Sequence, residues 1–351
     1  VYMGCTNTPQ KEDLMEDMNW YIDRSSGFIQ LSPLLPLEVV YARGHGSGTV
    51  GKLWSDHHFE FCEFISQFNP KTVLEIGGLH GVLASNYLKK IPNVDWTMIE
   101  PNPCAPDDLG IKIIKGFFDE GFEKKQDYDA IIHSHVLEHV YDLNSFMTHK
   151  SLVLNEGGLL LFSIPNMQEM LQRKYTNCLN FEHTFWLTEP YVENLLSKFK
   201  LRLIKKQYFK DDHSIFYAAV KDSTVEETVL EKSLYIKNKE TFSSFVDFMR
   251  SEVAKLNQLI SDIQTPVYLY GGHIFSQYLV NFGLREEFIT SILDNDPNKQ
   301  GGRLYGTSLI CHSPKILSDL DKATIILRAG IYNQEIKTDI TLNINPNIDF
   351  I

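Results

Sequence analysis

The sequence predicts an α/β protein with a doubly wound, mostly parallel sheet, followed by a second, smaller α/β domain. Three observations support this fold class. Short runs of β-forming residues alternate with amphipathic segments from residue 71 to residue 163. A glycine-rich turn, Gly77 to Gly81, joins the first strand to the first helix. A similar alternation begins again after Pro266. Such alternation is typical of parallel strands connected by helices.

Composition limits the classes of function. The 351 residues are 43% hydrophobic, which is enough for two or three domains with buried cores. A net charge of −12 argues against nucleic acid as the main partner. No apolar run is long enough to span a membrane, and no secretory signal is recognisable, so we expect a cytoplasmic protein. The five cysteines are widely spaced, which predicts neither a disulfide framework nor a metal site.

Changes in pattern predict four segments. Residues 1–55 are rich in Pro and Gly and predict an irregular N-terminal lobe ending in a loop. Residues 56–220 carry the strand–helix alternation, and residues 221–265 predict a helical linker with one apolar stripe. Residues 266–351 form the predicted second α/β domain.

The segment Lys71 to Leu88 predicts a strand, a tight turn and a helix. Glycines allow such a turn to bring backbone N–H groups close to a ligand at the N-terminus of a helix. The spacing Glu75-x-Gly77-x-x-x-Gly81 lacks the Gly-x-Gly-x-x-Gly of a nicotinamide site. It resembles motif I of class I S-adenosylmethionine (SAM) methyltransferases, although a plain structural turn is the alternative. The resemblance implies that Glu75, Gly77, Gly78 and Gly81 bind SAM.

Two further strand ends fit this cofactor. The second predicted strand, residues 96–99, ends in Glu100, about 20 residues beyond the glycines, where a carboxylate can hold a ribose diol. The third, residues 111–114, leads to Phe117 and Phe118, which either pack on an adenine ring or belong to the core.

The fourth predicted strand, residues 128–133, leads into His135 and then Val-Leu-Glu-His-Val at residues 136–140. This run matches a signature after strand four in many SAM methyltransferases, so we expect His135 to adjoin the cofactor. The fifth strand is expected at residues 158–163.

The loop before the first strand contains four glycines between residues 44 and 51. We predict that it is either a lid over cofactor and substrate or an ordinary flexible loop. His45, Ser47 and His57 are candidate substrate contacts, together with Asn180 further along the chain. Metal binding by His57 and His58 is not expected, because no third ligand follows at a recognisable spacing.

The candidate base lies after strand five. SAM carries an activated methyl group, so the enzyme has to position a nucleophile and remove its proton. The adjacent pair Glu182 and His183 offers a carboxylate and an imidazole for this task. A structural, hydrogen-bonded histidine is the alternative interpretation.

Residues 26–351 resemble the nucleotide-sugar C-methyltransferases, because Asp294 to Gly301 is close to a motif of their C-terminal, Rossmann-like domain. The resemblance implies that His183 removes a proton from the carbon beside a ketone. Two departures indicate a divergent member. Asn180 and Phe181 replace a Tyr and a His of the family, and the cysteines of its N-terminal zinc module are missing apart from Cys5, so zinc is not expected.

The sequence thus predicts a SAM-dependent methyltransferase that acts on the carbon of a nucleotide-linked keto-sugar. An O- or N-methyltransferase that modifies a surface-polysaccharide precursor or another small polar metabolite is the alternative. A non-catalytic binding protein that keeps the fold is the third possibility.

Overall fold

The computed structural model describes residues 1–41 and 51–351. Contacts divide the chain into two compact units. The seven-stranded unit comprises Trp20–Gln168 and Glu182–Tyr235, and the five-stranded unit comprises Val1–Asn19, Glu169–Phe181 and Ile236–Ile351. This division differs from the predicted segments, because the first 19 residues group with the C-terminal part of the chain rather than with a lobe of residues 1–55.

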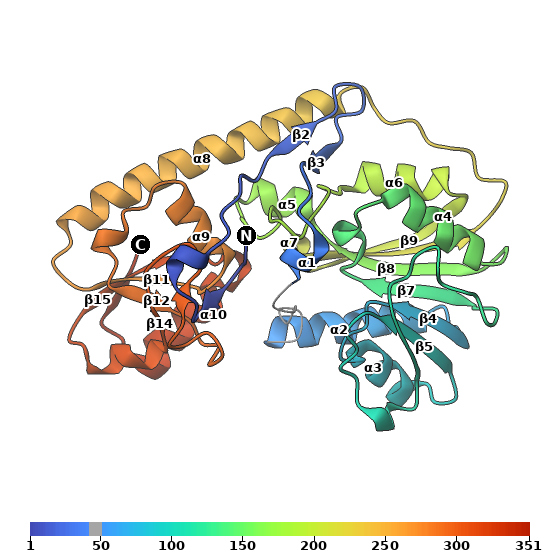
Figure 1. Ribbon diagram of the computed structural model, residues 1–351, viewed down its shortest axis with the longest axis horizontal. Helices are drawn as coiled ribbons and strands as arrows, with labels where there is room; N and C mark the ends of the chain where they lie inside the picture. The colour runs from blue at the N-terminus through green and yellow to red at the C-terminus, as the bar shows by residue number, and fades with distance from the viewer. Residues whose placement is uncertain (42–50) are drawn as a thin grey trace. The chain divides into compact units, whose positions relative to one another are not determined.

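The seven-stranded unit contains the predicted doubly wound sheet (Figure 1). Its strand order is β6-β5-β4-β7-β8-β10-β9, in which β6 to β8 run parallel and β10 runs antiparallel to both β8 and β9. The strands are β4 (Thr72–Ile76), β5 (Asp95–Glu100), β6 (Lys112–Lys115), β7 (Ala130–Ser134), β8 (Leu159–Pro165), β9 (Leu201–Phe209) and β10 (Ser214–Lys221). The five parallel strands confirm the predicted ones, with boundaries shifted by a few residues.

The site position follows from this order. The chain starts in the middle at β4, builds β5 and β6 on one side, and then crosses to β7 and β8 on the other. Ligands of such sheets bind at the carboxyl ends of the strands where the order reverses, here between β4 and β7. Because β10 is antiparallel and Ser214 pairs with Pro165, the start of β10 lies at the same edge.

Helices cover both faces of the sheet (Figure 1). α2 (Lys52–Ser66) and α3 (Val82–Lys90) lie on one face, and α4 (Leu143–Val153) and α6 (Glu189–Lys198) on the other. α2 buries Phe61, Phe64 and Ile65, as its apolar spacing predicts. The remaining elements of this unit are β2 (Trp20–Ile22), β3 (Ile29–Leu31), α1 (Leu37–Val40) and α7 (Lys210–His213). α5 (Met167–Gln172) belongs to the five-stranded unit from Glu169 onward.

The five-stranded unit is the predicted second α/β domain. Its parallel sheet has the order β14-β12-β11-β15-β16, and the predicted linker helix is α8 (Leu234–Asp262). None of the helices in the described part of the chain is long and apolar enough to cross a membrane. The other elements are β1 (Cys5–Thr6), β11 (Val267–Tyr270), α9 (Ile274–Asn281), β12 (Ser291–Leu293), β13 (Arg303–Leu304), β14 (Cys311–His312), β15 (Ala323–Leu327), α10 (Asn333–Asp339) and β16 (Ile348–Phe350).

Candidate functional site

The turn after β4 needs its glycines. Gly77 has φ +77° and donates its N–H to the Ile99 carbonyl at 3.0 Å. A Cβ on Gly78 would lie 2.4 Å from Met98 Sδ, and Gly81 begins α3 in the left-handed conformation with φ +64°. A side chain at Gly78 would clash with its neighbours, so this turn accommodates only glycine there. A cofactor can come close to the N–H groups of such a turn.

Two carboxylates support this turn. Glu75 is buried on β4 and accepts a 2.8 Å hydrogen bond from Trp96 Nε1. Glu100, at the end of β5, accepts from the Leu79 N–H at 3.3 Å and from the Asn102 N–H at 2.9 Å. Glu100 therefore lies against the glycine turn, where the predicted ribose diol would be held.

Burial raises the pKa of Glu75 to about 7, although the hydrogen bond from Trp96 opposes the shift. Since the ordinary value is 4.5, the protonated carboxyl stabilises the folded state, and this contribution is lost as the pH rises through 7. Relative to Glu75→Gln, we expect wild-type protein to lose about 3 kcal/mol of unfolding free energy between pH 4.5 and pH 8. Urea unfolding of both proteins measures this. Glu120 is exposed, so the control variant Glu120→Gln should have the same pH dependence of unfolding free energy as wild type. If Glu75→Gln also had the pH dependence of wild type, the raised pKa of Glu75 would be wrong.

The two candidate adenine contacts have different environments. Phe118 is buried and packs on Phe122, Phe146 and His149 with ring centroids 4.7 to 5.8 Å apart. The Phe117 side chain is 60% exposed. The structure therefore places Phe118 in the core, which argues against its predicted adenine contact and leaves Phe117 as the candidate.

A buried carboxylate lies in the loop after β7. Glu138 is fully buried, and its Oε1 is 3.2 Å from His135 Nδ1. Glu138, His139 and His183 each place one polar atom within 4.8 Å of the others. Burial opposes ionisation of Glu138, but contact with His135 and the nearby imidazoles of His139 and His183 lower its pKa to about 2. The predicted base His183 therefore lies beside an ionised carboxylate that sequence reasoning did not single out.

The neighbouring groups orient this cluster. His139 Nδ1 is 3.1 Å from the Glu182 carbonyl, and since a carbonyl only accepts, that nitrogen carries a proton. The Tyr41 hydroxyl lies 3.3 Å from the same nitrogen. Glu182 thus contacts His139 through its main chain. A catalytic role of the Glu182 side chain stays a prediction.

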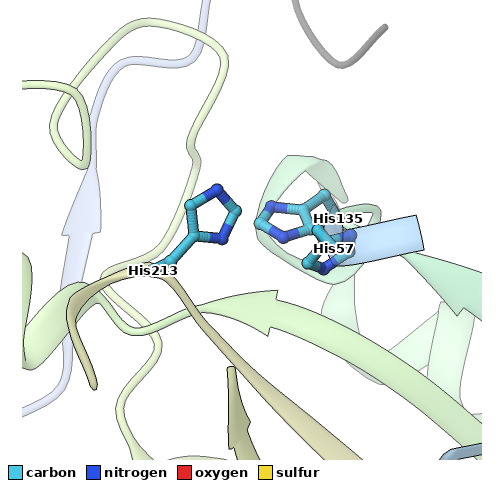
Figure 2. A group of neighbouring side chains, drawn as sticks. All are labelled: His57, His135 and His213. Atoms are coloured by element: carbon cyan, nitrogen blue, oxygen red, sulfur yellow. The ribbon is translucent and has the colours of Figure 1, made fainter. Parts of the chain in front are cut away.

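A second cluster lies at the same edge of the sheet. His57 from α2, His135 from the loop after β7 and His213 at the end of α7 place one ring nitrogen each within 4.8 Å of the others. Figure 2 shows the three imidazoles gathered at one place. His57 Nε2 is 3.0 Å from Ser163 Oγ, and Ser214 Oγ bridges His135 Nε2 at 2.9 Å and His213 Nδ1 at 2.6 Å. Sequence reasoning missed this set, because its members lie far apart in the chain.

Of the predicted substrate contacts, the structure describes His57 and Asn180. His45 and Ser47 lie outside the described residues. Asn180 is buried, donates to the Asn177 carbonyl at 3.0 Å, and belongs to the five-stranded unit. His57 is completely buried and belongs to the histidine cluster described above, so a role in substrate binding stays a prediction.

The five-stranded unit has a glycine turn of its own, Gly271-Gly272 after β11, and side chains of the same unit contact it. A Cβ on Gly272 would lie 2.7 Å from Cys5 Sγ of the N-terminal strand. Asp294 accepts from the Gly272 N–H at 2.8 Å and pairs with Lys299 at 3.0 Å. Arg303 is buried and pairs with Asp13 at 2.6 Å. These residues are therefore engaged within their own unit.

Comparison with known proteins gives a match for residues 54–206. A family model described as "Methyltransferase domain" matches residues 54–206. No curated protein sequence gives a significant match.

Among solved structures, human N-acetylserotonin methyltransferase in complex with SAM is 18% identical, with a TM-score of 0.41, over 49% of this chain and 53% of that one. A putative SAM-dependent methyltransferase from Listeria monocytogenes is 12% identical, with a TM-score of 0.40, over 48% of this chain and 100% of that one. An O-methyltransferase family protein from Burkholderia thailandensis is 13% identical, with a TM-score of 0.40, over 49% of this chain and 57% of that one. The chain thus spans about half the length of the human enzyme.

The sheet and its glycine turn define a Rossmann-like α/β fold of the class I methyltransferase type. Residues 54–206 match the methyltransferase-domain model, which supports SAM as the cofactor. Two features of the site fit that cofactor. The turn at Gly78 has no space for a side chain, and the Glu100 carboxylate lies at the end of β5 beside this turn.

Proposed function

We propose that the protein is a SAM-dependent methyltransferase that methylates carbon in a nucleotide-linked keto-sugar, with His183 as general base. Glu75, Gly77, Gly78, Gly81, Glu100 and Phe117 would hold the cofactor. The observation that carries the proposal is the position of His183 beside the buried carboxylate of Glu138, in the unit that contains the glycine turn.

This arrangement suits proton removal. SAM supplies the methyl group in an activated form. The His183 imidazole would take the proton from the carbon beside the ketone, which leaves an enolate whose carbon is the nucleophile. The proton remains on His183, and the negative charge of Glu138 stabilises the imidazolium that results. The buried position of Glu138 keeps this charge away from bulk water and so strengthens its effect.

The keto-sugar is inferred from the sequence motifs. Glu182 and His183 match the Glu-His of the nucleotide-sugar C-methyltransferases, and residues 294–301 resemble a motif of their C-terminal domain. The second sheet, β14-β12-β11-β15-β16, agrees with such a domain order. An imidazole beside a carboxylate also suits deprotonation of a hydroxyl, so O-methylation of a polar metabolite is the second candidate.

Deuterium exchange distinguishes the two candidates. The protein is incubated in deuterated water with S-adenosylhomocysteine and a 4-keto nucleotide sugar, and the sugar is analysed by mass spectrometry and NMR. We expect exchange of the proton beside the ketone, and with SAM a new carbon-bound methyl group. A methyl group on oxygen, or methyl transfer without exchange at that carbon, would contradict C-methylation.

A further inference from the structure

We propose that His57, His135 and His213 form a binding site for one divalent transition-metal ion of the zinc type. The three imidazoles come from α2, from the loop after β7 and from the end of α7, and all belong to the seven-stranded unit. The inference does not depend on the acceptor or on the type of methyl transfer.

The distances allow a common ion. Three atoms that lie no more than 4.8 Å from one another are all within roughly 2.8 Å of one point. Zinc binds imidazole nitrogen at about 2.1 Å, so each nitrogen would have to move by less than about 1 Å. Rotation of the side chains provides such a movement without a change of the backbone.

The environment of His57 points to a missing ligand. Its side chain is completely buried, yet its Nδ1 has no hydrogen-bond partner among the described residues. A buried polar atom without a partner is costly, and a bound ion would remove that cost. Its other nitrogen, Nε2, lies 3.0 Å from Ser163 Oγ. In metal sites, a hydrogen bond to the second nitrogen of a ligating histidine holds the ring in its orientation, and Ser163 can do this for His57.

His135 shows a second feature of metal ligands. Its Nδ1 is 3.2 Å from the buried Glu138 carboxylate, which leaves Nε2 to bind an ion. A carboxylate behind a ligating histidine orients the ring and makes it a better donor. Ser214, which bridges His135 and His213, holds these two rings together in the absence of an ion.

The set of donors favours a particular class of ion. Three imidazoles without a cysteine suit zinc, cobalt or nickel rather than magnesium or calcium, which prefer oxygen. Three protein ligands leave a fourth position open to a small molecule or water. The indole of Trp54 lies 5.0 to 5.3 Å from each of the three rings, so it forms an apolar wall beside the cluster.

Cobalt binding tests the site directly. Full-length protein, freed of metal and of any purification tag, is titrated with Co²⁺ while the visible absorption of the ion is recorded, and Zn²⁺ is then added in competition. We expect one equivalent of tightly bound Co²⁺ with a tetrahedral spectrum. His57→Gln and His213→Gln should each weaken binding at least about 100-fold, and Glu138→Gln about 10-fold as a positioning residue.

His312→Gln is the matched control, because this histidine is exposed on β14 in the other unit, and its binding should equal that of wild type. Far-UV circular dichroism shows whether each variant is folded. Glu138→Gln, which keeps all three imidazoles, gives an answer even if the buried ligand variants do not fold. No stoichiometric binding by wild type, or unchanged binding by folded His57→Gln and His213→Gln, would overturn the site. Either result leaves the proposed methyl transfer untouched, since the readout is metal binding alone.

Discussion

Replacing His183 by alanine should lower kcat by about 10²- to 10⁴-fold, the usual contribution of a general base. Binding of S-adenosylhomocysteine should stay within about threefold of wild type, because the proposed cofactor contacts lie in the turn after β4 and at the end of β5. Single-turnover measurements with saturating SAM separate the chemical step from binding.

Two additions make the His183 experiment specific. Imidazole added in solution should restore part of the lost rate, which a merely structural role would not allow. His312→Ala, which removes an exposed histidine of the five-stranded unit, should keep the wild-type rate. If His183→Ala turns over at the wild-type rate while it binds the cofactor, His183 is not the base.

Replacing Gly77 by alanine should weaken cofactor binding at least about 100-fold. Gly77 has φ +77°, and a Cβ there would lie 2.7 Å from Val136 Cγ2, so the turn has to shift. A moved turn no longer presents its N–H groups to the cofactor, and 100-fold corresponds to about 2.7 kcal/mol of binding free energy. Calorimetric titration with S-adenosylhomocysteine measures the change.

Gly157→Ala is a close control for backbone strain. Gly157 has φ +79° and no atom within 4 Å of a Cβ, and it lies just before β8. The left-handed backbone should cost each variant about 1 kcal/mol of stability, and Gly77→Ala adds the close contact with Val136. Only Gly77→Ala should lose cofactor affinity. Equal affinities of the two variants would show that the turn after β4 does not bind the cofactor.

The parallel strands were predictable, because apolar runs, glycine turns and strand-end carboxylates are local features. Gly77 and Glu100 illustrate this, since each is recognisable from its own segment and its place after a strand. The hairpin of β9 and β10 was not predicted. β9 is buried only at its two ends, Leu201 and Phe209, and carries Lys205 and Lys206 between them, so its apolar signal is weak.

Side-chain clusters were harder to predict, because they depend on packing between distant segments. His57, His135 and His213 are brought together by the sheet topology, and no spacing rule links them. Glu138 had a usable signal, since it is the acidic residue of Val-Leu-Glu-His-Val, but its burial between histidines is visible only in the fold. For Phe117 and Phe118 the sequence left both roles open, and packing separated them.

The most direct test of the account is a crystal structure with S-adenosylhomocysteine bound. We expect the ribose hydroxyls on the Glu100 carboxylate, the amino-acid end over the glycine turn, and the sulfur facing the His183 imidazole. A ribose bound away from Glu100, or a sulfur that points to the side opposite His183, would contradict it.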